Sequence, residues 1–217
     1  ADPARGWIVN ANNRLVSDAY PHFIAQYWPE PYRAMRITES LAATGGHRPE
    51  DSARLQQDAL SLGAAAALEA LLRAEPHSGR AARTIERLRA WDRRMDRTVY
   101  ADELGPVFPD WWSDRPLLLQ RTVAQDPSWC DDVTTPEPET CPQRLGEALE
   151  AALDRLERDH GPDPSRWRWG DAHQARFDHM LFGRIPYLRD LLRLRIASDG
   201  GNFTVNRGGF AIGREEA

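Results

Sequence analysis

Three asparagines lie close together near the start of the chain, in the stretch GWIVNANNRLV that runs from Gly6 to Val16. Asn10, Asn12 and Asn13 follow a short apolar run, and asparagine is poor inside strands but common in turns. One interpretation is a strand that ends in an Asx-type turn. The other is that one of these amides is held out as a hydrogen-bond donor for chemistry, and the three residues alone do not decide between them.

Two cysteines, Cys130 and Cys141, are the next residues with chemical potential. Ten residues separate them, which is not the C-x-x-C spacing of zinc or redox sites, and the acids, prolines and threonines between them are typical of a loop. A disulfide closing this loop would stabilise the fold by about 3 kcal/mol in the chain-entropy model. It would also place the protein in an oxidising, exported compartment. Two buried free thiols are the alternative.

The common catalytic signatures are absent from the sequence, including G-x-S-x-G, H-E-x-x-H and the glycine-rich phosphate loops. Asp131 and Asp132 could bind calcium, but acids in a loop before a helix are more often turn formers. His173 and His179 do not share a helix face, so we expect structural or surface roles for them. Trp167 and Trp169 alternate, and we expect one to pack in the core and the other to cover a surface or an interface.

The composition is that of a soluble globular protein, with 41% hydrophobic and 28% charged residues in 217. No apolar run approaches the roughly 18 residues of a membrane span. The net charge is -5 and the basic residues are spread among acids, so we do not expect nucleic-acid binding. All 28 basic residues are arginine, which excludes lysine as a nucleophile or base.

Helical periodicity dominates the middle of the chain. The clearest helix is 140–161, in which Thr140 and Gln143 form a capping box and Gly161 ends the helix. Leucines recur along it at helical spacing and predict a buried stripe. The patterns further predict a strand at 7–11, helices at 18–28, 32–46, 49–75 and 78–94, short helices at 98–125, a last short helix at 184–196, and a strand or hairpin at 200–212.

This order of elements predicts a predominantly helical α+β fold. Strand pieces at 6–16 and 200–212 enclose a mostly helical part at 20–196. Two short strands form a marginal sheet by themselves. Either the two ends pair with each other, or their sheet partners lie outside residues 1–217, so the chain looks like an excerpt from something larger.

The whole chain resembles the middle of the β chain of the penicillin acylase family, a group of N-terminal-nucleophile amide hydrolases. The cysteine-bearing loop resembles the branch of that family that includes the acyl-homoserine-lactone acylases. The resemblance implies that the chain forms part of the helical shell and the short strands of an αββα sandwich. The matching segments, in the family's order, are GWIVNANNR, YP with a tryptophan before YRAMRI, LQQDALS, LRAWD, WCDDVTTPEPETC, WRWGDAHQARFDH and GGNFTVN.

The resemblance also implies a mechanism. In the family, a serine freed at the start of the β chain attacks the acyl carbon of an amide, and its own α-amino group acts as the base. A backbone N–H and the side-chain amide of an asparagine stabilise the oxyanion. The matching asparagine is Asn12. The matching supporting arginine, 21 residues later, is Arg33. The implied partners are an acyl-amide substrate and the remainder of the acylase, which is its α chain and the rest of its β chain.

The chain departs from the family pattern at its first residue, Ala1, which is not serine, cysteine or threonine. We therefore expect a fragment that lacks the nucleophile and is inactive by itself. No cofactor is expected in this chain, whereas a structural calcium is compatible with the parent enzyme, which we expect to be periplasmic or secreted. The alternative is a non-catalytic helical binding or scaffolding domain derived from the family. Phenylacetyl, aliphatic and homoserine-lactone acyl amides all remain open as substrates.

Overall fold

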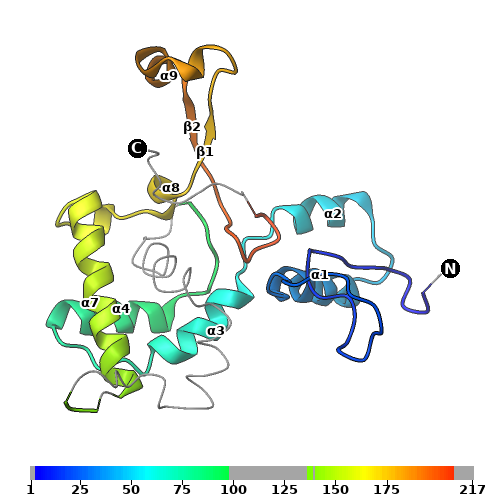
Figure 1. The fold of residues 1–217 in the computed structure, drawn as a ribbon, viewed down its shortest axis with the longest axis horizontal. Helices are drawn as coiled ribbons and strands as arrows, with labels where there is room; N and C mark the ends of the chain where they lie inside the picture. Colours follow the sequence, from blue (N-terminus) through cyan, green and yellow to red (C-terminus); the bar gives the residue numbers. More distant parts are fainter. Residues whose placement is uncertain (1–2, 98–135, 139, 208–217) are drawn as a thin grey trace.

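The computed structural model describes residues 3–97, 136–138 and 140–207. Its two strands pair as one antiparallel hairpin, so the described part is a mainly helical α+β structure, as predicted (Figure 1). The αββα sandwich stays a prediction. The elements are α1 (Tyr32–Ala43), α2 (Pro49–Gln56), α3 (Leu62–Leu71), α4 (Gly79–Ala90), α7 (Cys141–His160), η2 (Pro164–Arg166), α8 (Trp169–Ala172), β1 (Gln174–Phe177), η3 (Phe182–Arg184), α9 (Pro186–Leu192) and β2 (Leu194–Ala197).

Helix α7 forms as its sequence predicts. The Thr140 hydroxyl accepts a hydrogen bond from the backbone N–H of Gln143, whose side chain in turn accepts from the backbone N–H of Thr140. Gly161 follows the last turn at φ 87°, a value that favours glycine. The predicted leucine stripe is buried against α3 and α4. It consists of Leu145, Leu149, Leu153 and Leu156.

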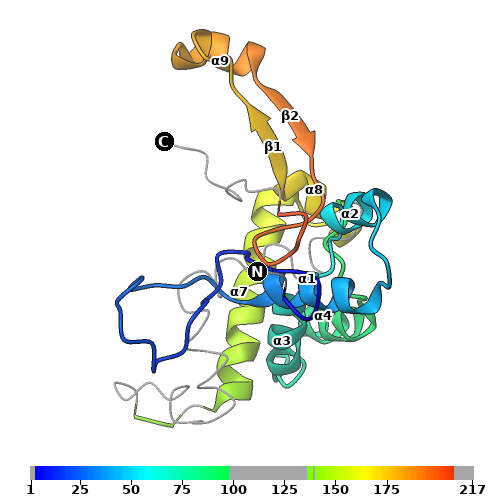
Figure 2. The same cartoon turned by 90° about the vertical axis from the view of Figure 1, so that its right-hand side faces the viewer.

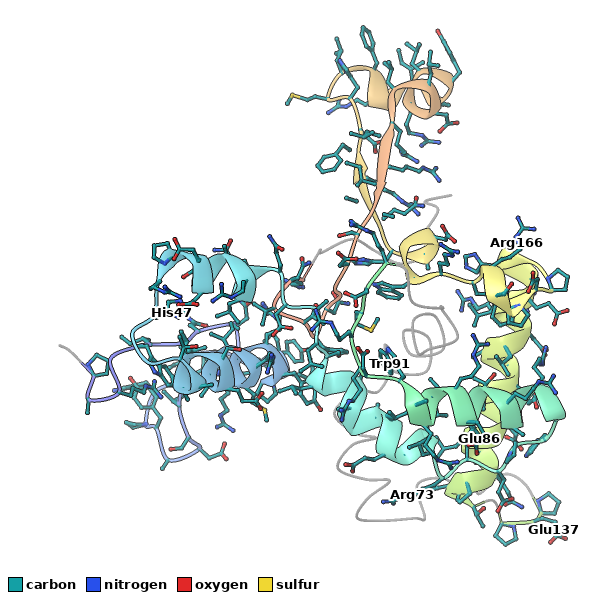
Figure 3. All side chains as sticks on the ribbon, turned by 180° about the vertical axis from the view of Figure 1, so that it is seen from behind. His47, Arg73, Glu86, Trp91, Glu137 and Arg166 are labelled. Atoms are coloured by element: carbon teal, nitrogen blue, oxygen red, sulfur yellow. The ribbon has the colours of Figure 1, made fainter. Side chains whose placement is uncertain are left out.

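The core lies between α3, α4 and α7 and continues into the tryptophans that follow α7. Trp91, at the end of α4, is buried in it (Figure 3). Trp167 and Trp169 are both buried, with 1% and 2% of their surface exposed, so the expectation that one of them covers a surface is wrong. Each indole N–H reaches a backbone carbonyl, that of Gly161 or Gly200, which removes the cost of burying it.

The predicted helix at 49–75 is two helices instead of one. α2 and α3 are separated at residues 57–61, and Asp58 and Ser61 lie in this connection. Ser61 caps α3 by accepting a hydrogen bond from the backbone N–H of Ala64. The connection also forms backbone hydrogen bonds to Arg93 and Met95, which follow α4. These contacts across the sequence override a helical pattern that is continuous through the break.

The strand predicted at 7–11 and the helix predicted at 18–28 are both wrong, since neither segment has regular secondary structure. A strand needs a partner, and within residues 3–97, 136–138 and 140–207 none pairs with 7–11. Residues 200–207 form turns instead of the predicted strand, and 208–212 lie outside the described residues. The helix at 32–46 is confirmed as α1, and the helix at 78–94 as α4.

The hairpin of β1 and β2 was not predicted. The segment expected to be a last helix at 184–196 divides into α9 and the strand β2, which pairs with residues 174–177. His173, just before β1, is buried and stacks on Trp169 with ring centroids 4.9 Å apart, so its structural role is confirmed. The expected short helices at 98–125, together with Cys130, Asp131 and Asp132, lie outside the described residues.

Candidate functional site

Arg33 and Asn12, the two site residues predicted from the sequence, are in direct contact. Arg33 is the second residue of α1, and its side chain reaches the N-terminal segment. One guanidinium nitrogen, Nη2, donates hydrogen bonds to the backbone carbonyl of Ala11 and to Oδ1 of Asn12, both at 2.8 Å. The arginine therefore fixes both the backbone and the side chain of the asparagine turn.

This contact determines which way the Asn12 amide faces. A guanidinium has five N–H donors and no acceptor, so the amide atom that meets it must be the oxygen. The nitrogen Nδ2, on the other side of Cγ in the same plane, then points away from the guanidinium. Within the described part of the chain, Nδ2 of Asn12 donates no hydrogen bond, and the residue is exposed. Asn12 thus presents an oriented N–H donor.

The two neighbouring asparagines, Asn10 and Asn13, stabilise the turn by accepting hydrogen bonds from its backbone N–H groups. Oδ1 of Asn10 accepts the backbone N–H of Asn12 at 3.0 Å, and Oδ1 of Asn13 accepts the backbone N–H of Ala11 at 3.2 Å. Asn12 itself has φ 68°, in the left-handed region that asparagine tolerates better than most residues. The Asx-type turn and the held amide are therefore both present: Asn10 and Asn13 stabilise the turn, and the amide of Asn12 is held by Arg33.

A positive charge lies directly beside Asn12, on the Arg33 guanidinium. Burial lowers the pKa of the Arg33 guanidinium, and the nearby charge of Arg207 lowers it further. The arginine stays protonated even so, because a guanidinium is effectively always protonated in proteins. The Arg33 cation in contact with Asn12 therefore favours an anion nearby, and Arg207 adds a second positive charge close to Arg33.

A second contact, between Arg36 and Asp58, fixes α1. Nε of Arg36, one turn after Arg33, lies 2.6 Å from Oδ2 of Asp58, a carboxylate that is only 9% exposed. The other carboxylate oxygen accepts the backbone N–H of Leu60 at 3.0 Å. The backbone carbonyl of Asp58 accepts from Asn206, which precedes Arg207. Asp58 thus joins α1, the α2–α3 connection and the 200–207 turn.

The turn at 200–207 meets α1 and the N-terminal segment in space although it is far from both in the sequence. The N-terminal segment, α1 and the turn at 200–207 lie side by side in both ribbon views (Figures 1 and 2). The ring of Phe203 packs edge-on against Tyr32 with centroids 5.7 Å apart. Burial and the neighbouring Glu30 carboxylate raise the pKa of Tyr32 to about 12, so the phenol stays neutral.

The geometry suits the stabilisation of a negative oxygen more than acid–base or metal chemistry. The described residues contain no group of three or more histidines, cysteines or acids that could hold a metal ion. None of the described helices is long and apolar enough to cross a membrane. Cys141 is buried in the first turn of α7 and is not a free cysteine, but Cys130 lies outside the described residues, so the disulfide pairing stays a prediction.

Comparison with known proteins decides the family. The sequence model of the penicillin amidase family matches residues 1–216, which is nearly the whole chain. The chain belongs to the penicillin amidase family. The family predicted from the ordered segments GWIVNANNR to GGNFTVN is therefore confirmed.

The relatives of this penicillin amidase chain are acylases. The acyl-homoserine lactone acylase QuiP of Pseudomonas aeruginosa strain PAO1 is 28% identical over 230 aligned positions, covering 86% of this chain and 27% of the relative. QuiP of Pseudomonas fluorescens strain Pf0-1 is 27% identical, covering 99% of this chain and 30% of the relative. The penicillin acylase 2 proenzyme of Pseudomonas sp. strain SE83 is 28% identical, covering 94% of this chain and 29% of the relative. The chain spans about 30% of the length of these curated relatives.

Asp58 and Arg36 are the residues of this penicillin amidase site that sequence reasoning missed. A signal was present, since Asp58 lies in LQQDALS, one of the segments that carry the resemblance. Its role depends on a contact with Arg36, 22 residues earlier on another helix, and no local pattern encodes that contact.

Proposed function

We propose that this chain supplies part of the oxyanion site of an amide hydrolase that removes an acyl group from an amine. The observation that carries the proposal is the hydrogen bond between Arg33 Nη2 and Asn12 Oδ1. It leaves the amide N–H of Asn12 available to a reacting oxygen and holds it in a fixed orientation. Preorganised neutral donors of this kind stabilise charge that develops in the transition state.

In the proposed reaction, the nucleophile is an N-terminal serine that lies outside this chain. Its hydroxyl oxygen bonds to the acyl carbon, its proton passes to the serine α-amino group, and the carbonyl electron pair moves onto the carbonyl oxygen. Asn12 donates to that oxygen. The intermediate then collapses, the C–N bond breaks, and the amine leaves with the proton. Water attacks the resulting ester in the same way and releases the carboxylic acid and the serine.

The role proposed for Arg33 is positioning. Its two hydrogen bonds go to Ala11 and Asn12 rather than into open space, and its fork of donors suits that task. Its charge also adds to the positive potential at the site. Removal of a single oxyanion donor typically costs about 3–4 kcal/mol of transition-state stabilisation, so Asn12 is the residue whose loss is expected to matter most.

We propose N-acylated small molecules as the substrate class. The names of the relatives support this choice, since they describe acylases of acyl-homoserine lactones and of penicillins. In both kinds of compound a flexible acyl chain is joined to the amine of a small ring by an open-chain amide. The proposal extends to a periplasmic or secreted acylase with a Cys130–Cys141 disulfide, in which any structural calcium is held outside this chain.

The test is hydrolysis by the complete acylase that contains this chain, measured on a panel of phenylacetyl, aliphatic and homoserine-lactone acyl amides. Asn12→Ala is expected to lower kcat by about a hundredfold or more while leaving precursor processing intact. Asp18→Ala is the matched control, because Asp18 is exposed and pairs with Arg14, which is itself partly exposed. A processed acylase without activity on any amide would overturn the proposal in favour of a non-catalytic domain.

A further inference from the structure

The β1–β2 hairpin and its tip form an arm, which we define as residues 174–197. Figures 1 and 2 both show it standing away from the helical body, with η3 and α9 at its far end. The two strands pair with each other, and η3 packs against α9. Figure 3 shows side chains projecting from the arm all along its length.

The arm is rich in apolar side chains that the described residues leave exposed. Ala175, at its base, is its only buried residue. Monomeric soluble proteins rarely expose contiguous apolar patches of more than a few hundred square ångströms, and larger ones mark interaction sites. The large apolar side chains of the arm that are more than half exposed are Phe177, Met180, Leu181, Tyr187, Leu191 and Leu194.

The strand register gives the hairpin two different faces. Ala175 is paired with Ile196, and Phe177 with Leu194, so these four side chains share one face. The opposite face carries Arg176, which is paired directly with Arg195. The face that carries Phe177 and Leu194 therefore calls for an apolar cover.

The arm also differs from the rest of the chain in its net charge. It contains five arginines and two aspartates, a formal charge of +3, whereas the whole chain carries -5. One of the aspartates, Asp178, already pairs with Arg193. The arm is thus a basic, apolar projection from a chain whose other residues are acidic overall.

A two-stranded hairpin is marginally stable by itself in water, and this one buries almost nothing. Its order requires a partner. The relatives supply a reason to look within the same protein, because this chain spans only about 30% of their length. A chain that forms part of a larger acylase must share its apolar surfaces with the remaining part.

We infer that the apolar face of the arm is covered by a segment of the same acylase that lies outside residues 1–217. The inference rests on the proposed function in one respect, since it takes the chain to be part of a larger acylase. It does not depend on Asn12 or on catalysis.

Cysteine labelling of the complete, processed acylase tests the inference. Tyr187→Cys and Leu191→Cys each place a thiol on the tip of the arm. In this structure Tyr187 is 73% exposed and Leu191 is 77% exposed. Asp18→Cys is the matched control, since its side chain is 94% exposed on the N-terminal segment. The unsubstituted acylase gives the background from Cys130 and Cys141. Maleimide is expected to label both arm positions about tenfold or more slowly than position 18, because access then requires local opening.

Equal labelling rates at the three positions would overturn the inference. So would protection that disappears when the acylase is diluted to a monomer, because the cover would then be a second copy. Hydrolysis is measured on the same samples. An active acylase with an unprotected arm defeats this inference alone, and an inactive acylase with a protected arm defeats the proposed function alone.

Discussion

Arg33 binds the side-chain oxygen of Asn12 at 2.8 Å, and this leaves the nitrogen of the same amide for another acceptor. The two ends of the amide thus have different tasks. The oxygen fixes the side chain to α1, and the nitrogen faces the reaction. Substitutions that separate these tasks provide a sharper test of the site than removal of the whole side chain.

Asn12→Asp separates the two tasks at position 12. An aspartate keeps an oxygen for Arg33 but has no N–H to donate, and it places a negative charge beside the developing oxyanion. We expect kcat to fall at least as far as in Asn12→Ala, by about a hundredfold or more, with little loss of thermal stability. Steady-state kinetics and a melting curve on the complete acylase check this. An aspartate variant that retains most of its activity would show that Asn12 acts through its oxygen alone.

At position 10, in contrast to position 12, an aspartate is expected to preserve kcat. Asn10 serves the turn through Oδ1, which accepts the backbone N–H of Asn12, and an aspartate keeps that acceptor. Asn10→Asp should therefore retain most of the activity, whereas Asn10→Ala releases the turn and should lower kcat about tenfold through misplacement of Asn12. KM should change little in either variant. If the alanine and aspartate variants are equally impaired, the backbone contact of Asn10 is not what positions the donor.

Arg33→Lys should make the activity sensitive to alkaline pH. A lysine has an ordinary pKa of about 10.4, and the burial and the Arg207 charge that lower the pKa of Arg33 would lower that of the lysine as well. A cation with a lowered pKa loses its charge as the pH rises through that value. We therefore expect kcat of the variant to decline, relative to the unsubstituted enzyme, as the pH rises through a value below the ordinary lysine pKa. Parallel pH profiles would contradict a role for the charge at this position.

The parts of the fold that the sequence predicts well are those that local signals determine. Helix α7 carries its own cap, its leucine stripe and its terminal glycine, and it forms as expected. The break between α2 and α3 was missed because Asp58 is held by Arg36, 22 residues away. The hairpin was missed because its strands have four residues each and gain their order from pairing across the arm.

The site was predictable only through resemblance. Composition and spacing left three asparagines equivalent, whereas the family pattern selected Asn12 and Arg33, and the structure brings these two into contact. The strand predicted at 7–11 was wrong for a physical reason. Its apolar residues favour a strand, but no partner lies in residues 3–97, 136–138 and 140–207, and Ile8 is 75% exposed.

The Arg36–Asp58 pair should contribute strongly to stability. Asp58 is nearly buried, so its loss leaves the Leu60 N–H and a partly covered guanidinium without their acceptor. Because Arg36 keeps some access to water, we expect Asp58→Ala to cost about 2–3 kcal/mol, less than a fully buried pair. Glu39→Ala is the matched control, since Glu39 contacts the same arginine at 3.4 Å but is half exposed. Thermal unfolding of the two variants tests this. Equal melting temperatures would refute the role of Asp58 in linking α1, the α2–α3 connection and the 200–207 turn.

Gly146 on α7 is expected to tolerate no side chain. A Cβ at this position would lie 1.9 Å from the backbone carbonyl oxygen of Glu75, whose N–H donates to the carbonyl of Pro142. Gly146→Ala would push α7 away from the segment after α3, and overpacking of this kind costs about 1–3 kcal/mol. Gly79→Ala on α4 is the control, because its Cβ would meet only the Arg83 side chain at an ordinary 3.5 Å. We expect that control to be neutral or stabilising by up to about 1 kcal/mol, and a melting curve in which both variants behave alike would contradict the close packing of α7.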